Sequence, residues 1–425
     1  MESHSPQTRS FPIGEFEFVA MMAGFQMLQS LAVDVMLPAL GTISRDLGET
    51  DPNSRQYIIG VFLIFSGLGT LVPGALADRF GRRPVILGAL CAYAVSSLAC
   101  AIAGSFELLL IARAVMGLFA SAMMVMPMTI LRDRFEGDKM ARTQSLVAMV
   151  FMVMPMMAPM IGQTVLLFAS WRWIFGIMAS VSALVFLWTI LRLPETLREE
   201  NRQPVQIGVI GRNMVKAFTV REAFGYFLGA AFVQGALFGY LNSAQQLVGE
   251  HFGMGTLFPV VFGTMALIMA STNFINARIV EKFGARRVSH AAMMVYIVTA
   301  VIHLVLAWHG EGFWTFAPLM TISMCMMSFI GANFQAISLQ PFARMAGAAA
   351  SVMSFVRMVL GSVLGALIGQ AYDGSAVPIM VAMVVCGSVC IGLVLFSERG
   401  QLFRRLNPPG FYKGKISPAG IEGAE

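Results

Sequence analysis

The chain has 425 residues, of which 57% are hydrophobic and only 12% are charged, and its mean hydropathy is +0.73. Soluble globular proteins carry roughly twice that charged fraction, so the composition excludes a soluble fold. The net charge is +6 and the pI is about 9.2, but the basic residues are scattered through short segments, which argues against nucleic-acid binding.

Apolar stretches that are nearly free of charge recur along the whole chain, and each reaches the ~20 residues that span a bilayer as a helix. Lipid offers the backbone no hydrogen-bond partner, so every span is expected to be helical. The pattern predicts an all-α integral membrane protein with twelve transmembrane helices. The spans are 16–40, 55–77, 84–104, 107–131, 140–169, 171–192, 222–248, 255–280, 286–308, 313–340, 343–372 and 376–397.

The basic residues predict the orientation of these spans. With the N-terminus inside, three of the 29 Lys and Arg fall in external loops or at the outer end of a span (Arg45, Arg55 and Arg172), and two lie well within spans (Arg113 and Arg357). The other 24 then lie in cytoplasmic segments or at the cytoplasmic ends of spans, which places both termini in the cytoplasm. The polar N-terminal segment runs straight into a full-length span, so no cleavable signal peptide is expected.

The longest polar stretch, 193–220, divides the spans into two sets of six. The expected organisation is a cytoplasmic segment 1–15, a first half 16–192, a linker 193–220, a second half 221–397 and a cytoplasmic tail 398–425. Apolar residues at helical spacing within 205–218 suit an amphipathic helix at the membrane surface, and a flexible linker explains them equally well.

Span 1 contains Asp34, the only acid placed well inside a span, and span 4 contains Arg113 at a similar expected depth. Each such charge costs a few kcal/mol near the bilayer centre, so both mark function by default. A carboxylate at this depth is a candidate proton site, because burial favours its neutral form and a nearby arginine favours its charged form. The alternative is a static ion pair that holds spans 1 and 4 together.

The loop between spans 2 and 3 carries the most informative string of the chain. It combines a leading glycine, an acid, a turn glycine and several bases, which suits a latch between helices at the inner membrane surface. We expect Gly74 to allow close helix approach, and Asp78 to cap a helix or to pair with an arginine. A positively charged inner loop with a turn glycine is the simpler alternative. The string consists of Gly74, Asp78, Arg79, Gly81, Arg82 and Arg83, with Leu76 and Phe80 between them.

A weaker copy of the string follows at a constant shift of 203 positions. Asp78 corresponds to Glu281, Gly81 to Gly284 and Arg83 to Arg286, whereas Ala277 replaces the leading glycine. Matched acids, bases and glycines at one shift predict two structurally related halves. In a membrane protein this arrangement is typical of a transporter whose site lies between the halves.

The string over 74–83 resembles the signature of the loop between helices 2 and 3 in the major facilitator superfamily, at every defining position. The resemblance implies two pseudo-symmetric six-helix halves over nearly the whole chain. Shorter strings resemble the bicyclomycin-resistance (Bcr/CflA) branch of drug:proton antiporters. They are Asp34-x-x-Leu37-Pro38-Ala39-Leu40, Arg113-x-x-x-Gly117-x-x-Ala120, Pro155-x-x-Ala158-Pro159-x-x-Gly162, Trp171-Arg172-Trp173, Leu193-Pro194-Glu195-Thr196 and Ala346-Gly347.

This resemblance implies proton coupling through Asp34 and Arg113, and a hinge in span 5 at Pro155, Ala158, Pro159 and Gly162. Arg357 lies mid-span in the second half, where it either faces the cavity and meets an anionic or polar substrate group, or else snorkels or pairs with another group of the chain. Other polar and thioether side chains form a candidate substrate cavity, or equally bond between helices. They are Gln26, Gln29, Met124, Gln234, Tyr240, Asn242, Asn333 and Gln335.

The chain shows no phosphate-binding loop, metal-ligand cluster or nucleophile triad, so the sequence does not indicate an enzyme or a cofactor. We expect a monomeric transporter of the bacterial inner membrane, in contact with lipid and an apolar or amphipathic substrate, and not with nucleic acid. The proton gradient is the expected energy source for efflux. A transporter for one metabolite, such as a sugar, amino acid or siderophore, and a transporter-like receptor are the alternatives.

Overall fold

The computed structural model describes residues 13–135, 143–144, 146–147, 154–197, 199, 202, 208, 215 and 218–404, and this part of the chain is helical throughout its regular structure. The expected linker helix lies largely outside the described residues. The first half contains α1 (Glu15–Asp34), α2 (Leu40–Asp46), α3 (Tyr57–Gly69), α4 (Val72–Phe80), α5 (Arg82–Ala101), α6 (Phe106–Arg134), α8 (Met154–Phe168) and α9 (Arg172–Arg192). The second half contains α11 (Arg221–Ala244), α12 (Phe258–Phe283), α13 (Ala285–Trp308), α14 (Phe313–Leu339), α15 (Ala346–Gln370) and α16 (Val377–Ser397).

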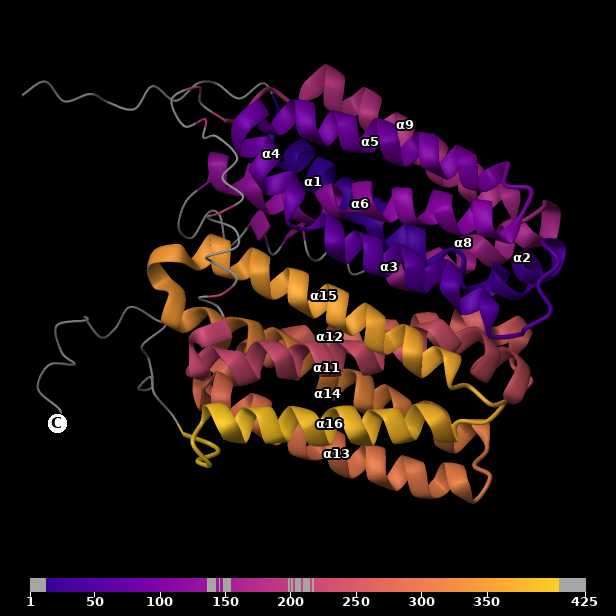
Figure 1. Cartoon of the computed structure of the whole chain (residues 1–425), viewed down its shortest axis with the longest axis vertical. Helices are drawn as coiled ribbons and strands as arrows, with labels where there is room; N and C mark the ends of the chain where they lie inside the picture. The colour runs from indigo at the N-terminus through magenta and orange to yellow at the C-terminus, as the bar shows by residue number, and fades with distance from the viewer. Residues whose placement is uncertain are drawn as a thin grey trace, which may run out of the picture.

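The helices form two bundles that correspond to the two halves of the chain (Figure 1). Across the boundary between them, α3 packs on α15 and α8 packs on α12. The described chain begins and ends at the same end of the bundles, which we call the termini face. The opposite end, which carries α2 and the loop that precedes α3, is the distal face.

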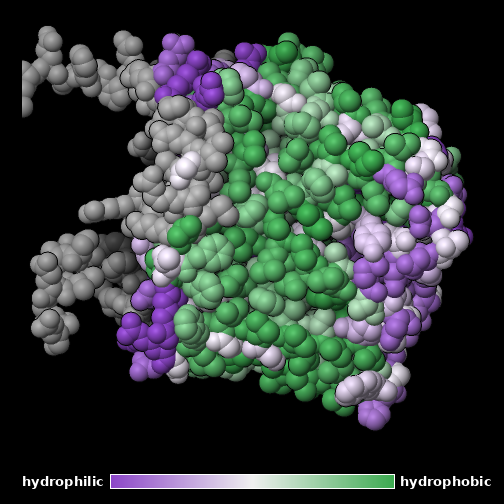
Figure 2. Space-filling view, viewed as in Figure 1, coloured by the Kyte–Doolittle hydropathy of each residue, from purple (hydrophilic) through white to green (hydrophobic). Residues whose placement is uncertain are grey.

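Ten described helical segments are long and apolar enough to cross a membrane, and the pair Ser54–Gly69 and Val72–Phe80, bent by 44°, forms one more. The remaining apolar helix, Met157–Phe168, belongs to a span whose first part lies outside the described residues. Figure 2 shows hydrophobic residues over the middle of the molecule and hydrophilic residues at its two ends. The predicted architecture of twelve membrane helices agrees with these features.

The two halves repeat one local conformation at the end of their second span. Gly81 separates α4 from α5 with φ 104° and ψ 158°, and Gly284 separates α12 from α13 with φ 86° and ψ 147°. Residues that carry a side chain rarely adopt such positive φ angles, so glycine is required at both turns. The shift of 203 also relates Tyr93 to Tyr296, and each buried hydroxyl donates to a backbone carbonyl, that of Leu28 or that of Met383.

The first span is longer than expected and is broken after the 20 residues of α1. After Asp34 the helix gives way to a 3₁₀ turn, Leu37–Ala39, and then resumes as α2 to Asp46. Pro38 explains the break, because its ring removes a backbone donor and crowds the preceding turn. The longer span places Asp34 twelve residues from the distal end of α2, roughly 18 Å at ~1.5 Å per residue.

Candidate functional site

Asp34 is buried at the break in the first span, with 7% of its surface exposed. Ser30, one turn earlier on α1, donates a hydrogen bond of 2.5 Å to Asp34 Oδ2. Among the described residues, no cation lies within ion-pair distance of the carboxylate. The acid is therefore held by one hydroxyl in an otherwise apolar setting, where its charge state depends on what approaches it.

Arg113 is completely buried, but it is held by α3 instead of by Asp34. Its Nε donates to the backbone carbonyl of Ile58 at 3.0 Å, and its guanidinium stacks over the Phe62 ring at 4.3 Å from the ring centroid. A Cβ at Gly117, one turn further along α6, would overlap the Phe62 carbonyl oxygen. The Arg113–Gly117 string thus docks α6 closely on α3.

The expected pair between spans 1 and 4 is not formed in this structure. Arg113 lies seven residues into α6, roughly 10 Å from its distal end at ~1.5 Å per residue, so it is nearer the distal face than Asp34. Counted from the helix ends, the two residues do not share the depth expected from the sequence, because the first span continues beyond its proline break. A direct role for Arg113 at the carboxylate needs another conformation.

The hinge string of span 5 lies beside the same break. In α8, a Cβ at Gly162 would overlap the backbone carbonyl oxygen of Val35 and would lie 3.2 Å from Pro38. Ala158 is fully buried, and Pro159 interrupts the hydrogen bonding of α8 from within. Because α8 also packs on α12 of the second half, it connects the surroundings of Asp34 to the boundary between the halves. Pro155 lies in the first turn of α8.

A small, partly open cavity lies in the second half between α11, α14 and α15. Arg357 on α15 lines it, together with Gln335, Ser338 and Ser354. Phe227 and Met353 are among its apolar walls. Of the sequence-predicted cavity residues, Arg357 and Gln335 are the ones found here. Ser338 and Ser354 gave no sequence signal, because serines are common in membrane helices as inter-helix bonding groups.

The other predicted cavity residues have more local roles in this structure. Gln29 donates to Ser66 at 3.0 Å, Tyr240 donates to Met265 at 3.5 Å, and Asn333 joins α14 to α12 through a 2.8 Å bond to Asn276. These three match the alternative of inter-helix bonding. Three further candidates, Gln26, Met124 and Gln234, are partly buried.

Asn242 differs from those candidates because it is both buried and unbonded. It is 2% exposed, and neither its Nδ2 nor its Oδ1 finds a partner among the described residues. A buried amide without partners costs free energy, so Asn242 remains a candidate for contact with substrate or water.

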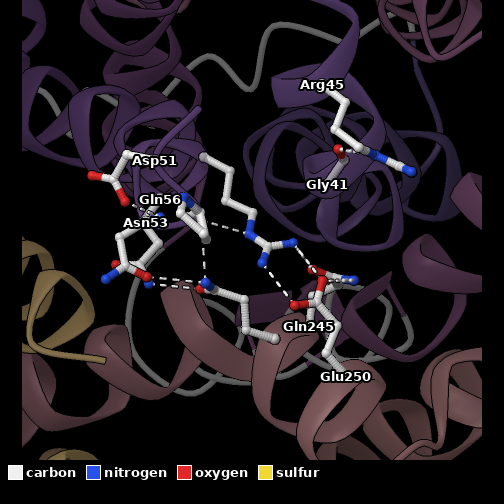
Figure 3. Close-up of polar contacts among 10 residues, drawn as sticks. Gly41, Arg45, Asp51, Asn53, Gln56, Gln245 and Glu250 are labelled. Atoms are coloured by element: carbon white, nitrogen blue, oxygen red, sulfur yellow. Dashed lines mark hydrogen bonds and ion pairs between the residues drawn. The ribbon is translucent and has the colours of Figure 1, made fainter. Parts of the chain in front are cut away.

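Polar groups join the two halves at the distal face (Figure 3). Arg55, in the 3₁₀ turn Ser54–Gln56, donates to both carboxylate oxygens of Glu250 at 2.6 and 2.8 Å and to Gln245 at 3.0 Å. Glu250 and Gln245 belong to the π-helical segment Gln245–His251 that follows α11. This bidentate ion pair crosses from the first half to the second.

A second set of distal contacts is made by amides. Gln56 donates to Gln246 at 2.7 Å, and Gln246 donates to Asn53 at 3.0 Å. The side-chain amide of Asn53 donates to the backbone carbonyl of Gln370, at the end of α15. The side-chain amide of Gln370 donates in turn to the backbone carbonyl of Asn53. No sequence pattern indicated this network, because its members lie in short segments and at helix ends of opposite halves. We call the ion pair and these amides the distal network.

The loop string at the termini face bonds within the first half. Arg82 donates to Asp78 at 2.6 Å and to Asp133 at 3.0 Å, and Glu195 accepts from the backbone N–H of Arg82 at 2.8 Å. Asp78 therefore adopts the second of its two expected roles, pairing with an arginine. Arg79 is exposed, with its guanidinium 5.1 Å from the Phe80 ring centroid.

The second half uses an acid at the matching position in a different way. Glu398 lies 203 residues after Glu195 and accepts from Arg286 at 2.7 Å and from the Tyr226 hydroxyl at 2.7 Å. Arg286 itself corresponds to Arg83, whose guanidinium donates to the carbonyl of Ile190. The repeat thus extends to the acid after the sixth span, although the partner of that acid changes from backbone to side chain.

One expectation is corrected by the surroundings of the residue. A Cβ at Gly74 would meet no atom within 4 Å, so close helix approach does not explain this glycine here. His303, near the distal end of α13, is fully buried, and its Nε2 lies 3.0 Å from Oε1 of the buried Glu311 side chain.

A family profile described as the Major Facilitator Superfamily matches residues 22–366. The chain is 29% identical over 377 residues to a bicyclomycin resistance protein homolog of Haemophilus influenzae, covering 87% of this chain and 93% of that protein. It is 27% identical to a chloramphenicol resistance protein of Pseudomonas aeruginosa, covering 90% and 92%.

Among solved structures, a D-xylose–proton symporter has the same fold, with a TM-score of 0.72, 14% identity and coverage of 91% of this chain and 99% of that one. The profile covers most of the chain, and the two related bundles, the loop string and its echo agree with it. The chain therefore belongs to the major facilitator superfamily.

Proposed function

We propose that the protein exports amphipathic small molecules in exchange for protons. The observation that carries this proposal is Asp34, a buried carboxylate at a break in the first span, held by Ser30 alone among described residues. A carboxylate that gains a proton on one side of the membrane and loses it on the other couples proton entry to transport. Its position against Gly162 supports coupling to the packing of α8 on the second half.

The arrangement of the two faces supports an inward-facing state. The distal network joins the halves at one end, whereas the cavity at Arg357 is lined near the termini-face ends of α11 and α14. The excess of basic residues in the segments of the termini face supports a cytoplasmic position for both termini. We place the protein, as a functional monomer, in the inner membrane of a bacterium, with the proton gradient as its energy source and no cofactor.

The names of the relatives suggest the substrate class. Two proteins that match over most of the chain are named for resistance to two different compounds, bicyclomycin and chloramphenicol. We therefore favour export of several unrelated drug-like molecules over transport of one metabolite. Competition between chemically unrelated compounds in everted vesicles tests this choice, because a metabolite transporter would discriminate among them.

The proton-site assignment is tested by Asp34→Asn in proteoliposomes with an imposed pH gradient. We expect pH-driven uphill transport of a fluorescent cationic or neutral drug to be lost, because asparagine cannot exchange a proton. The matched control is Glu107→Gln, which neutralises an exposed carboxylate in the first turn of α6. Normal uphill transport by Asp34→Asn, with the control also active, would show that the proton uses another group.

A further inference from the structure

The two arginines inside the membrane helices, Arg113 and Arg357, differ in their bonding partners. Arg113 has a backbone carbonyl and an aromatic face as neighbours. Arg357 lies eleven residues after the start of α15, roughly 16 Å into the span at ~1.5 Å per residue, and it lines the cavity. Within the described part of the chain, no group accepts a hydrogen bond from its guanidinium, and no carboxylate lies within 4.0 Å.

An arginine side chain remains charged at any physiological pH, so burial does not relieve it by deprotonation. A charge at this depth without an anion is costly, and a ligand that supplies the anion recovers that cost on binding. The planar guanidinium offers parallel donors that match a carboxylate or another planar oxyanion in a bidentate geometry.

The remaining walls of the cavity complete an amphipathic site. Ser354 lies one turn before Arg357 on α15, and Gln335 faces the same space from α14, so two further polar side chains are near the guanidinium. Phe227 and Met353 supply apolar surface, and methionine adapts to ligands of different shape.

We propose that this cavity binds amphipathic organic anions, with the oxyanion on Arg357 and the apolar body against Phe227 and Met353. This inference rests on the proposed transport function and adds a substrate class to it. Export of an anion carries negative charge outward, and entry of a proton carries positive charge inward. A membrane potential that is negative inside therefore favours both steps of the exchange. Export of a neutral molecule moves only the charge of the proton.

The test compares naphthoate with naphthamide, which share their apolar body and differ in the charged group. Binding is measured by scintillation proximity on purified full-length protein in nanodiscs of zwitterionic lipid, without a pH gradient. We expect wild type to prefer naphthoate, and Arg357→Gln to weaken naphthoate binding by roughly tenfold, the loss of one charge-assisted hydrogen bond. Naphthamide binding should change little.

Arg132→Gln is the matched control, because Arg132 is an exposed arginine at the end of α6 on the termini face. A nonspecific effect of net charge would affect both variants equally and would overturn the proposal. Thermal unfolding without ligand gives a second readout. If Arg357 has no counter-ion, its replacement by glutamine should leave the unfolding temperature unchanged or raise it. If Arg357 belonged to a structural ion pair, the same replacement would lower the unfolding temperature.

The source of the anion is resolved by adding phosphatidylglycerol to the nanodiscs. Competition with naphthoate that depends on Arg357 supports the oxyanion site and identifies a lipid headgroup as an occupant. Absence of competition with retained naphthoate preference supports a soluble anion. Equal affinity of wild type for naphthoate and naphthamide would refute the site.

These results separate the site from the proposed function. Loss of proton-driven transport concerns Asp34 and leaves equilibrium binding at Arg357 intact. Loss of anion preference leaves proton-driven export of neutral compounds intact.

Discussion

The two faces of the molecule are stabilised in different ways. At the distal face, hydrogen bonds and an ion pair cross from one half to the other, from Arg55 to Glu250 and from Gln56 to Gln246. At the termini face, every hydrogen bond whose two partners are both described stays within one half, as in the bond from Arg82 to Asp133. The contacts that close this conformation are therefore those of the distal network, while the loop bonds stiffen each half.

This difference refines the idea of a latch in the loop at 74–83. A latch between the halves must make contacts that exist in one state and break in the other. The loop residues make no such contacts here among described partners, whereas the distal network does. Opening of the distal face must break the distal network, so the strength of this network sets part of the balance between the two states.

The largest effect is expected from Arg55→Ala, which removes both bonds to Glu250 and the bond to Gln245. The Arg55 side chain is 7% exposed and that of Glu250 is 52% exposed, so the substitution removes the ion pair between the halves without leaving a buried carboxylate. We expect the population to shift toward an outward-open state, with a longer distance between spin labels at Thr50 and Ala371 on the distal face. Labels at Arg132 and Glu222 on the termini face should move closer together.

Arg45→Ala is the matched control for this prediction. Arg45 is an exposed arginine of the same face, and its Nε bonds to the Gly41 carbonyl within its own half (Figure 3). Unchanged label distances in Arg55→Ala, or equal changes in both variants, would show that the ion pair does not hold the face closed. The exchange Arg55→Glu with Glu250→Arg should restore the closed distances.

A smaller shift in the same direction is expected from Gln246→Leu. Gln246 accepts from Gln56 and donates to Asn53 and to the Pro52 carbonyl, so leucine leaves buried polar groups unpaired at a cost of about 1–3 kcal/mol. Neutral amides bond more weakly than an arginine–carboxylate pair, which places this effect below that of Arg55. The same distal label pair measures it.

Gln29→Leu serves as the control, since Gln29 is a partly buried amide that bonds to Ser66 within the first half. An equal shift in this variant would mean that lost amide bonds loosen the protein in general, without a specific role for the contact between the halves.

The sequence was sufficient for the architecture, because hydrophobic length and the repeated glycine turn are local properties. Gly81 and Gly284 could be matched by spacing alone, and both adopt the same backbone conformation. The separation of Asp34 from Arg113 could not be foreseen, because the first span continues beyond its proline break. A hydropathy pattern gives the depth of a residue only when the ends of its helix are known.

The distal network was beyond sequence analysis for a related reason. Arg55 and Glu250 are 195 residues apart and lie in short irregular segments, so neither spacing nor periodicity connects them. Arg357 was easier, because a charge in an apolar span is visible in the sequence and the cavity gives it a location. Only the structure shows that the guanidinium has no bonding partner among the described residues.

The smallest effect concerns the termini face and the pH dependence of Glu398. Burial acts to raise the pKa of this carboxyl, but hydrogen bonds from Tyr226 and Arg286 outweigh burial and hold the pKa below its ordinary value of 4.5. A lowered folded-state pKa means that the ion pair stabilises the fold fully above that ordinary value, and that this contribution is lost as pH falls through the lowered pKa. The unfolding temperature of wild type should therefore decline in this acidic range more steeply than that of Glu398→Gln, which cannot titrate at this position. At neutral pH the variant should unfold at a slightly lower temperature, while its distal label distances stay closed, because Glu398 bonds within the second half. A change in the distal distances would contradict the division of roles between the two faces.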